Sequence, residues 1–343
     1  MSQWARMHGR PWAWGWSMAA LLVLTSVICA GRAQAADDGQ SAIASERAAH
    51  SLLIDAAQAG KRLVVVGDRG HILYSDNQGG AWTQAQVPSR QLLTAVYFVD
   101  ATHGWAVGHD AQVLASEDGG ATWRKQFEDL AREAPLLDVL FLDTHHGFAV
   151  GAYGALLETR NGGQQWHDVS DRLDNPEQLH LNAIAHVKDR GLFIVGEQGS
   201  MFRSGDDGQS WASVPGPYEG SLFGVLGTAR PATLLAFGLR GNLLRSADFG
   251  DTWQRITLST ERGPFAAGLS GAALLDDGRV VVVGNAGSVL VSEDDGETFT
   301  VNSRRDRIAL AAVAGLADQR LLLVGQGGIH LADAQGQDLE VQP

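Results

Sequence analysis

The chain has 343 residues and a formal net charge of −13, with 45% hydrophobic residues, 42 Gly and one Cys. The hydrophobic content is sufficient for a packed core, which excludes a wholly disordered chain. A single Cys excludes a disulfide framework and a zinc site built from several Cys residues. The acidic balance argues against DNA or RNA as the main partner, because phosphate binding needs a basic surface.

Residues 1–35 have the pattern of a secretory signal peptide. Arg6 and Arg10 precede an apolar run that ends in the small-x-small triplet Ala-Gln-Ala at 33–35. A retained membrane anchor and a lipoprotein modified at Cys29 are the alternatives. No later segment offers the ~18 uninterrupted apolar residues of a membrane helix. We therefore expect an exported protein that does not span the membrane after cleavage, located in a periplasm, or in a thylakoid lumen if the source is photosynthetic.

One pattern recurs seven times along the rest of the chain. Each copy has an apolar run ending in Gly, a short turn, a second apolar run, and then a Ser-x-Asp-x-Gly-x-Thr-Trp turn, or Asp box. The leading glycines of the first and last copies, Gly67 and Gly325, are 258 residues apart, which is six periods of 43. The seventh Asp box is degenerate. Seven such units occupy nearly all of the chain, so we expect a lead-in at residues 36–49 and one domain at 50–343.

Each repeat holds four short strand candidates. They are rich in Val, Leu and aromatic residues and are bounded by Gly, Asp and Asn turns. In the second repeat they are Leu93–Phe98, Gly104–Gly108, Val113–Ser116 and Trp123–Phe127. Four strands per repeat, seven times over, predict an all-β, seven-bladed β-propeller of four-stranded blades with Asp-box turns. A solenoid is the alternative architecture, although it typically uses shorter repeats.

The Asp-box residues are predicted to be structural. The Asp or Asn oxygen can accept backbone N–H groups across the turn, the Gly suits a positive φ, and the Trp can pack against a neighbouring blade. A catalytic group would occur once, rather than six times at equal spacing. The predicted structural residues are Asn77, Asp118, Asn161, Asp206, Asp248 and Asp294, with Trp82, Trp123, Trp166, Trp211 and Trp253.

These Asp boxes, preceded by a Gly-Trp-Ala-Val-Gly strand, resemble the photosystem II stability/assembly factor family of β-propellers. The copies at His103–Trp123 and His146–Trp166 are especially similar, and the resemblance extends over about residues 50–340. It implies a seven-bladed, non-enzymatic factor that binds membrane-protein subunits during assembly. The expected partner is a subunit of a membrane-protein complex or another envelope protein, bound by a monomer that needs no cofactor.

Strand alternation assigns the loops to two faces. The Asp-box face has the turns between the first and second strands (first turns) and the Asp boxes. The connector face has the turns between the second and third strands (second turns) and the blade-to-blade connectors. On the Asp-box face we count 17 acidic residues and five cations, against 12 acidic residues and nine Arg on the connector face.

The connector face is the predicted partner-binding surface. Arg recognises carboxylates and is enriched at interface hot spots, and long loops on a rigid scaffold often carry binding. The longest connectors, Phe127–Leu136 and Ser170–Leu181, lie on this face. The alternative is that the arginines are solvated and paired with nearby acids. The candidate residues are Arg69, Arg90, Arg132, Arg172, Arg240, Arg262, Arg304, Arg305 and Arg307.

A sialidase-like glycoside hydrolase and a glycan-binding propeller are the alternative functions. Tyr218-Glu219 could serve as the nucleophile and base of a sialidase. However, Arg230-Pro231 lacks the aromatic-Arg-Ile-Pro context of a sialidase and lies on the opposite face. For His145-His146 a role in the turn is favoured over metal ligation, because no His/carboxylate set has convincing ligand spacing. We therefore predict no enzymatic activity and no metal site.

Overall fold

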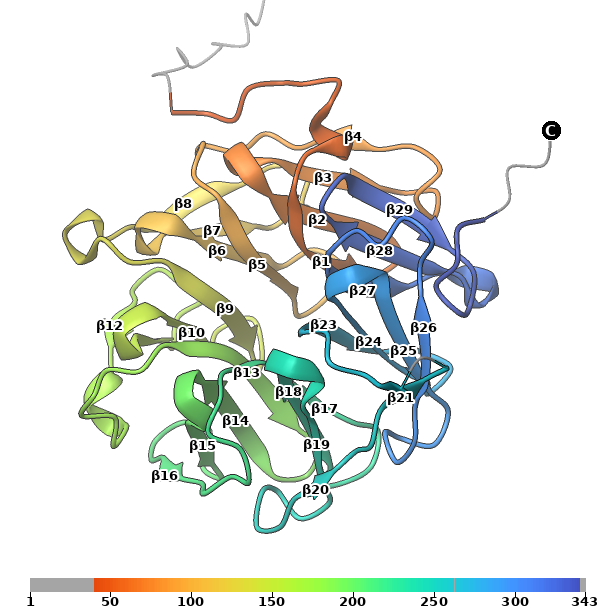
Figure 1. Ribbon diagram of the computed structural model, residues 1–343. Coiled ribbons are helices and arrows are strands. Elements are labelled where there is room, and N and C mark those ends of the chain that lie inside the picture. The colour runs from red at the N-terminus through yellow and green to blue at the C-terminus, as the bar shows by residue number, and fades with distance from the viewer. Residues whose placement is uncertain (1–39, 262, 340–343) are drawn as a thin grey trace, which may run out of the picture. The chain divides into compact units, whose positions relative to one another are not determined.

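Each repeat folds into one antiparallel sheet, and the sheets follow one another around a central opening (Figure 1). The computed structural model describes residues 40–261 and 263–339. Within these residues six blades have four strands and the seventh has three, beyond which an isolated bridge pairs Ala332 with Asp338. The prediction of an all-β, seven-bladed propeller is confirmed. The predicted signal peptide at residues 1–35 lies outside the described residues.

Blades 1 to 4 follow the repeats without interruption. Their strands are β1 (Leu53–Ala59), β2 (Arg62–Gly67), β3 (Ile72–Ser75) and β4 (Thr83–Gln84); β5 (Leu93–Phe98), β6 (Gly104–Gly108), β7 (Val113–Ser116) and β8 (Arg124–Phe127); β9 (Leu136–Phe141), β10 (Gly147–Gly151), β11 (Leu156–Thr159) and β12 (His167–Asp168); and β13 (Leu181–Val187), β14 (Gly191–Gly196), β15 (Met201–Ser204) and β16 (Ala212–Ser213).

Blades 5 to 7 include one small hairpin in a connector, formed by β21 and β22. The strands are β17 (Leu222–Gly227), β18 (Leu234–Gly238), β19 (Leu243–Ser246) and β20 (Gln254–Arg255); the hairpin strands β21 (Ser259–Thr260) and β22 (Gly263–Pro264); β23 (Leu269–Leu274), β24 (Val280–Gly284), β25 (Ser288–Ser292) and β26 (Thr300–Ser303); and β27 (Leu310–Gly315), β28 (Leu321–Gly325) and β29 (Gly328–Ala332).

Short 3-10 turns join these strands. Six form the second turns of blades 1 to 6, and the others lie in the lead-in, in two connectors and in the first turn of blade 7. They are η1 (Ala48–His50), η2 (Asp68–Gly70), η3 (His109–Ala111), η4 (Leu130–Arg132), η5 (Ala152–Gly154), η6 (Ser170–Arg172), η7 (Glu197–Gly199), η8 (Leu239–Gly241), η9 (Asn285–Gly287) and η10 (Ala317–Gln319).

The predicted strands of the second repeat agree with the structure to within one residue. The one difference is that β8 begins at Arg124, because the Trp123 N–H donates to the Gln86 carbonyl of blade 1 and not to its own sheet. Every residue of β6 is buried, as is every residue of β10. These strands are continuous apolar runs because both faces of the sheet pack against neighbouring blades.

The Gly that ends each second strand allows a close backbone approach. At Gly108 a Cβ would lie 2.2 Å from the Leu92 carbonyl oxygen, and at Gly238 it would lie 2.2 Å from the Ser221 carbonyl oxygen. The backbone at both residues is extended, so the reason is space and not a positive φ. This contact is at the entry of the inner strand, and it explains why Gly recurs once in every repeat.

The Asp box is a hydrogen-bonded turn closed by two side chains. Asp118 Oδ1 accepts the N–H groups of Ala121 (3.0 Å) and Thr122 (2.9 Å), and Ser116 Oγ accepts the Gly120 N–H at 2.8 Å. Gly120 has φ +87°, a region that an L side chain rarely adopts. Asn77 and Asn161 use their amide oxygen in the same way, so the turn needs an acceptor and does not need a charge.

Substitutions of Asp118 distinguish the contribution of its hydrogen bonds to stability from the contribution of its charge. Asp118→Ala is expected to lower the free energy of unfolding by about 0.5–2 kcal/mol, as for the loss of a comparable helix cap. Asp118→Asn should cost much less, because blades 1 and 3 already use Asn at this position. Urea unfolding of both variants tests this, and equal losses would contradict the acceptor role.

Side chains of one blade hold the Asp box of the next. Trp211 of blade 4 meets Phe148 of blade 3 edge-on, with ring centroids 6.3 Å apart. In addition, an Arg or Gln donates to a backbone carbonyl in the following Asp box, at 2.8–3.3 Å. These pairs are Arg62 with Gly119, Gln126 with Gly162, Arg172 with Gly208, Arg203 with Phe249, Arg245 with Asp295, and Arg304 with Gly336.

Blades 7 and 1 pack side by side, and among the described residues neither blade contributes a strand to the other's sheet. Inner strand β1 lies beside β27 (Figure 1), and each of the two blades is built from one continuous stretch of chain. Gln58 Nε2 donates to the Gly315 carbonyl at 2.7 Å across this junction. The described part of the lead-in follows the outer edge of blade 1, where the Ala42 N–H donates to the Val87 carbonyl at 2.9 Å.

Candidate partner-binding surface

The second turns present one side chain each at the same place in the scaffold. In blades 1 to 6 the middle residue of the turn has a φ of 52–59° although it is not Gly. Its side chain therefore projects from the tip, with a small Gly or Ala following it. These tip residues are Arg69, Asp110, Tyr153, Gln198, Arg240 and Ala286. The backbone of the turn is the same in each of these blades, whereas the side chain at its tip differs. This arrangement is expected of a recognition surface on rigid elements.

Apolar side chains are exposed on the same face. Tyr153 is 61% exposed at a turn tip, Leu239 is 40% exposed beside the tip residue Arg240, and Phe223 is 39% exposed at the second position of β17. Sequence reasoning missed these residues because it looked for charge alone. Their positions relative to the leading Gly of each repeat could have identified them. Exposed large apolar groups near cations are typical of protein interfaces.

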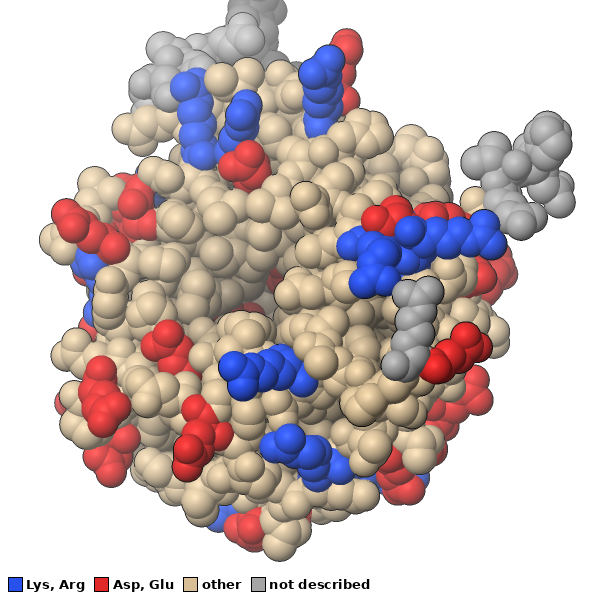
Figure 2. Space-filling view, in the orientation of Figure 1, with Lys and Arg blue, Asp and Glu red and all other residues tan. Residues whose placement is uncertain are grey.

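Five of the predicted arginines are exposed on the same face. Arg69, Arg240, Arg305 and Arg307 are exposed, and Arg69 is 3.5 Å from Asp68. Arg90 is also exposed, and its Nε donates to the Ser41 carbonyl at 2.7 Å. In the face seen in Figure 2 many charged side chains lie toward the rim, and basic side chains also lie close to the central hollow. Arg262 lies outside the described residues.

Three other predicted arginines are held by contacts within the protein. Arg304 is 2% exposed and pairs with Asp306 and Asp338, so it is not part of the exposed surface. Arg132 pairs with Asp168 of the next blade. Arg172 Nη1 contacts Glu158 Oε2 and the Gly208 carbonyl, both at 2.9 Å, and thereby joins blades 3 and 4.

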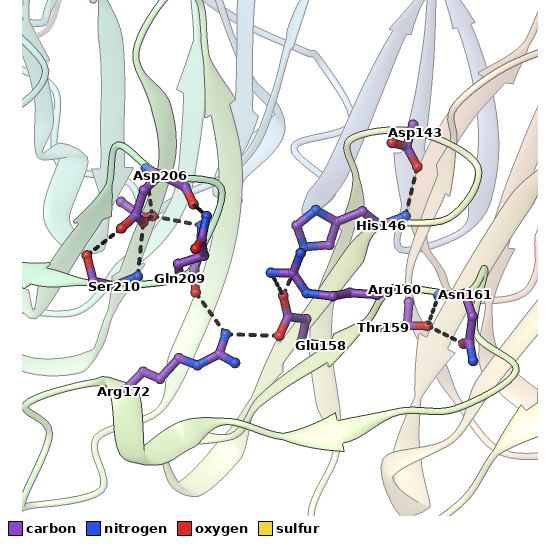
Figure 3. A network of polar contacts seen from close by, with 12 residues as sticks. Asp143, His146, Glu158, Thr159, Arg160, Asn161, Arg172, Asp206, Gln209 and Ser210 are labelled. Atoms are coloured by element: carbon purple, nitrogen blue, oxygen red, sulfur yellow. Dashed lines mark hydrogen bonds and ion pairs between the residues drawn. The ribbon is translucent and has the colours of Figure 1, made fainter.

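Figure 3 shows the buried Glu158 at the centre of a cationic cluster. Its carboxylate is contacted by His146 Nε2 at 3.0 Å, Arg160 Nη2 at 2.6 Å and Arg172 Nη1 at 2.9 Å. The Asp143 carboxylate accepts the His146 N–H at 2.8 Å and so holds the first turn of blade 3. A buried carboxylate needs such partners, and Glu158 consequently holds Arg172, which the sequence had predicted to bind a partner.

Two carboxylates on the inner strands β1 and β9 each contact the inner strand of the next blade, a feature that sequence reasoning did not find. Asp55 Oδ2 accepts the Val96 N–H of blade 2 at 2.8 Å, and Asp138 Oδ2 accepts the Ile184 N–H of blade 4 at 2.9 Å. Each side chain is only partly exposed and is enclosed by the ring. Burial raises the pKa of Asp55 to about 6 and that of Asp138 to about 7, although the backbone hydrogen bonds oppose the shift.

The residues considered for a sialidase-like glycosidase lie on opposite faces of the propeller. Arg230 is in the first turn of blade 5, on the Asp-box face, where its Nη1 pairs with Glu297 Oε1 at 2.6 Å. Tyr218 is in a connector on the opposite face, and its hydroxyl donates to the Leu239 carbonyl at 3.4 Å. In residues 40–261 and 263–339 no group of three or more His, Cys, Asp or Glu side chains is arranged to hold a metal ion.

Part of the chain matches a known family model. Residues 74–135 and 126–224 match PSII_BNR, described as photosynthesis system II assembly factor YCF48. A chloroplastic photosystem II stability/assembly factor, HCF136 of Cyanidioschyzon merolae (strain NIES-3377 / 10D), is 42% identical over 62 residues. The photosystem II assembly protein Ycf48 of Synechococcus sp. (strain JA-2-3B'a(2-13)) is 38% identical over 61 residues. Each match covers 17% of this chain, but only 14% and 18% of the respective relative.

Solved structures share the fold over most of the chain. A structure of YCF48 bound to D1 peptide has a TM-score of 0.64 at 18% identity, covering 83% of this chain and 94% of that one. YCF48 from Cyanidioschyzon merolae has a TM-score of 0.63 at 17% identity, covering 85% and 97%. The WD40 propeller domain of Doa1 has a TM-score of 0.63 at 10% identity, covering 85% of this chain and 94% of that one. Because the identities are this low, the structural similarities establish the architecture alone.

The family model and the two sequence relatives match part of the chain, and the solved structures share its seven-bladed fold. The chain is therefore a seven-bladed β-propeller, and the matches within it support a photosystem II stability/assembly factor-like family, the family that its repeats resemble.

Proposed function

We propose that the chain is an exported, non-enzymatic assembly factor whose connector face binds an exposed segment of a membrane-protein subunit. The observation that carries the proposal is the set of exposed Arg and apolar side chains at one end of the ring. The recurring Asp-box residues, in contrast, are held by contacts within and between blades. The family supports an assembly role, and a related YCF48 has been solved with a D1 peptide.

The proposed contact set is narrower than the nine arginines of the sequence. It consists of the exposed cations Arg69, Arg90, Arg240, Arg305 and Arg307, together with the apolar residues Tyr153, Phe223 and Leu239. Guanidinium groups would pair with carboxylates of the partner, and the apolar side chains would lose their water on contact. Such a surface suits an acidic segment that also carries apolar residues.

Charge reversal tests this surface. The double variant Arg305→Glu, Arg307→Glu is expected to reduce capture of the partner from native membranes by about tenfold or more, because it replaces two attractive charges with two repulsive ones. Crosslinking and pull-down, followed by identification of the captured subunit, measure the effect. The matched control is Glu293→Arg on the Asp-box face, which should retain capture. Equal losses from both variants would contradict the proposal.

Export is proposed from the predicted signal at residues 1–35. In the described residues no helix is long and apolar enough to cross a membrane. Cell fractionation and N-terminal sequencing of the purified protein test this part. A mature protein beginning near residue 36 in the periplasmic or lumenal fraction supports it, and a cytoplasmic protein retaining Met1 contradicts it.

A further inference from the structure

A cavity of about 730 Å³ lies on the Asp-box face, at the junction of blades 6, 7 and 1. Its walls are the ends of the three inner strands β1, β23 and β27. Its rim is formed by the first turns of these blades and by Gln78 of the first Asp box. Since first turns and second turns lie at opposite ends of the strands, the cavity is at the other end of the ring from the proposed partner-binding surface.

Small side chains line the cavity at the ends of its three inner strands. The fifth residue of β1, β23 and β27 is Ala in each case, whereas the corresponding residues of β5 and β9 are Tyr97 and Leu140. The last residue of β27, Gly315, also has no side chain. Blade 4 has Ala185 at the same position, so these small residues contribute to the space at blades 6, 7 and 1 but do not determine it alone.

Two hydrogen bonds across the junction of blades 7 and 1 hold the rim. Gln58 Nε2 donates to the Gly315 carbonyl at 2.7 Å, and the Ala317 N–H donates to Gln78 Oε1 at 2.8 Å. On the blade 6 side, the buried Arg279 donates to the Gln319 carbonyl at 3.1 Å. A cavity whose walls are already fixed loses little entropy when it binds a ligand.

Some charged residues around the cavity form ion pairs with each other and others do not. Asp277 pairs with Arg279 at 2.8 Å, and both are therefore occupied. Asp276 and Asp318 are exposed on the rim, and neither takes part in an ion pair or side-chain hydrogen bond with another of the described residues. The remaining charged group is the exposed Lys61. The lining thus has a net negative charge, on the face where acidic residues outnumber cations.

We propose that this cavity binds a Lys or Arg side chain presented by a polypeptide segment, with Asp276 and Asp318 as its carboxylate partners. The volume suits a few residues of such a segment, and charge-assisted hydrogen bonds to carboxylates supply the specificity. The inference goes beyond the proposed function, because the propeller then holds segments of opposite charge at its two ends and can bridge two parts of an assembling complex.

Isothermal titration calorimetry with two synthetic probes tests the site. The probes are the capped peptides Gly-Arg-Gly-Arg-Gly and Gly-Glu-Gly-Glu-Gly. The Arg peptide is expected to bind the folded propeller and the Glu peptide is not. The variant Asp276→Asn, Asp318→Asn should weaken binding of the Arg peptide at least tenfold. Ala273→Leu, which fills the wall without changing any charge, should weaken it to a similar extent.

Two controls make the outcome decisive. Asp207→Asn, at an exposed residue of the blade 4 Asp box on the same face, should change the affinity less than twofold. Arg305→Glu, Arg307→Glu should leave Arg-peptide binding intact, so failure of the proposed partner surface is distinguished from failure of this site. No binding of the Arg peptide at low salt, or equal weakening by Asp207→Asn, would overturn the proposal. Thermal unfolding of each variant confirms that it is folded.

Discussion

Replacing Arg304 with alanine is expected to lower the free energy of unfolding by about 2–4 kcal/mol. Its side chain is fully buried, and the guanidinium contacts Asp306 at 2.7 Å, the Asp338 carboxylate and the Gly336 carbonyl. The substitution leaves a void between blades 6 and 7 and removes the donor from a carbonyl that this guanidinium satisfies. The two carboxylates are partly exposed and can be rehydrated, which keeps the loss below that of an isolated buried charge.

The neighbouring residue is the matched control. Arg305 carries the same side chain one position further along the connector but is exposed, so Arg305→Ala should change stability by less than about 0.5 kcal/mol. Arg304→Met retains much of the side-chain volume, so its loss in free energy of unfolding should lie between those of Arg304→Ala and Arg305→Ala. Urea unfolding at constant pH gives all three values. Similar losses for Arg304→Ala and Arg305→Ala would mean that burial of Arg304 contributes nothing measurable.

Raising the pH from 5 to 8 is expected to destabilise the fold by about 2–4 kcal/mol through Asp55 and Asp138. Both folded-state pKa values, about 6 and about 7, are above the ordinary value of 3.8. The folded state therefore binds protons more tightly than the unfolded state. The resulting stabilisation is fully present below about pH 3.8 and is lost as the pH rises through 6 and 7.

Chemical denaturation across this pH range measures the effect. The double variant Asp55→Asn, Asp138→Asn should lose this fall in stability. Its stability should instead rise slightly with pH, because burial lowers the pKa of His71 and His330. Asp189→Asn, in an exposed turn, should keep the wild-type slope. Below pH 4 the trend reverses, because hydrogen bonds in the Asp boxes hold the pKa of Asp206 and Asp294 at about 2. A wild-type profile that is flat from pH 5 to 8 would contradict the prediction.

The features predicted well are those determined by neighbouring residues in the chain. Strands β5, β6 and β7 have the predicted bounds, because each is a short apolar run between turn residues. The Asp box was recognised because its acceptor and donors lie within four residues of one another. The degenerate seventh box also has a side-chain acceptor for nearby backbone donors, since Asp333 accepts the N–H groups of Gln335 and Gln337.

The binding surface was predicted less well, because exposure depends on neighbouring blades. Arg304 and Arg305 are adjacent in the connector between blades 6 and 7, yet one is buried against the Asp box of blade 7 and the other is exposed. Likewise, Arg172 is held by Glu158 of its own blade and by Gly208, 36 residues away. Counting charges by face treated these residues as equivalent.

The number of blades, their strands and the position of each Asp box follow from a local pattern repeated every 43 residues, so they can be read along the chain. Three features depend on contacts between residues from about 36 to 257 positions apart: which arginines are exposed, how blade 7 packs against blade 1, and where a cavity forms. Such contacts exist only after the ring has closed. The repeat can therefore be recognised in the sequence, whereas the burial of a given side chain is determined by the packing between blades.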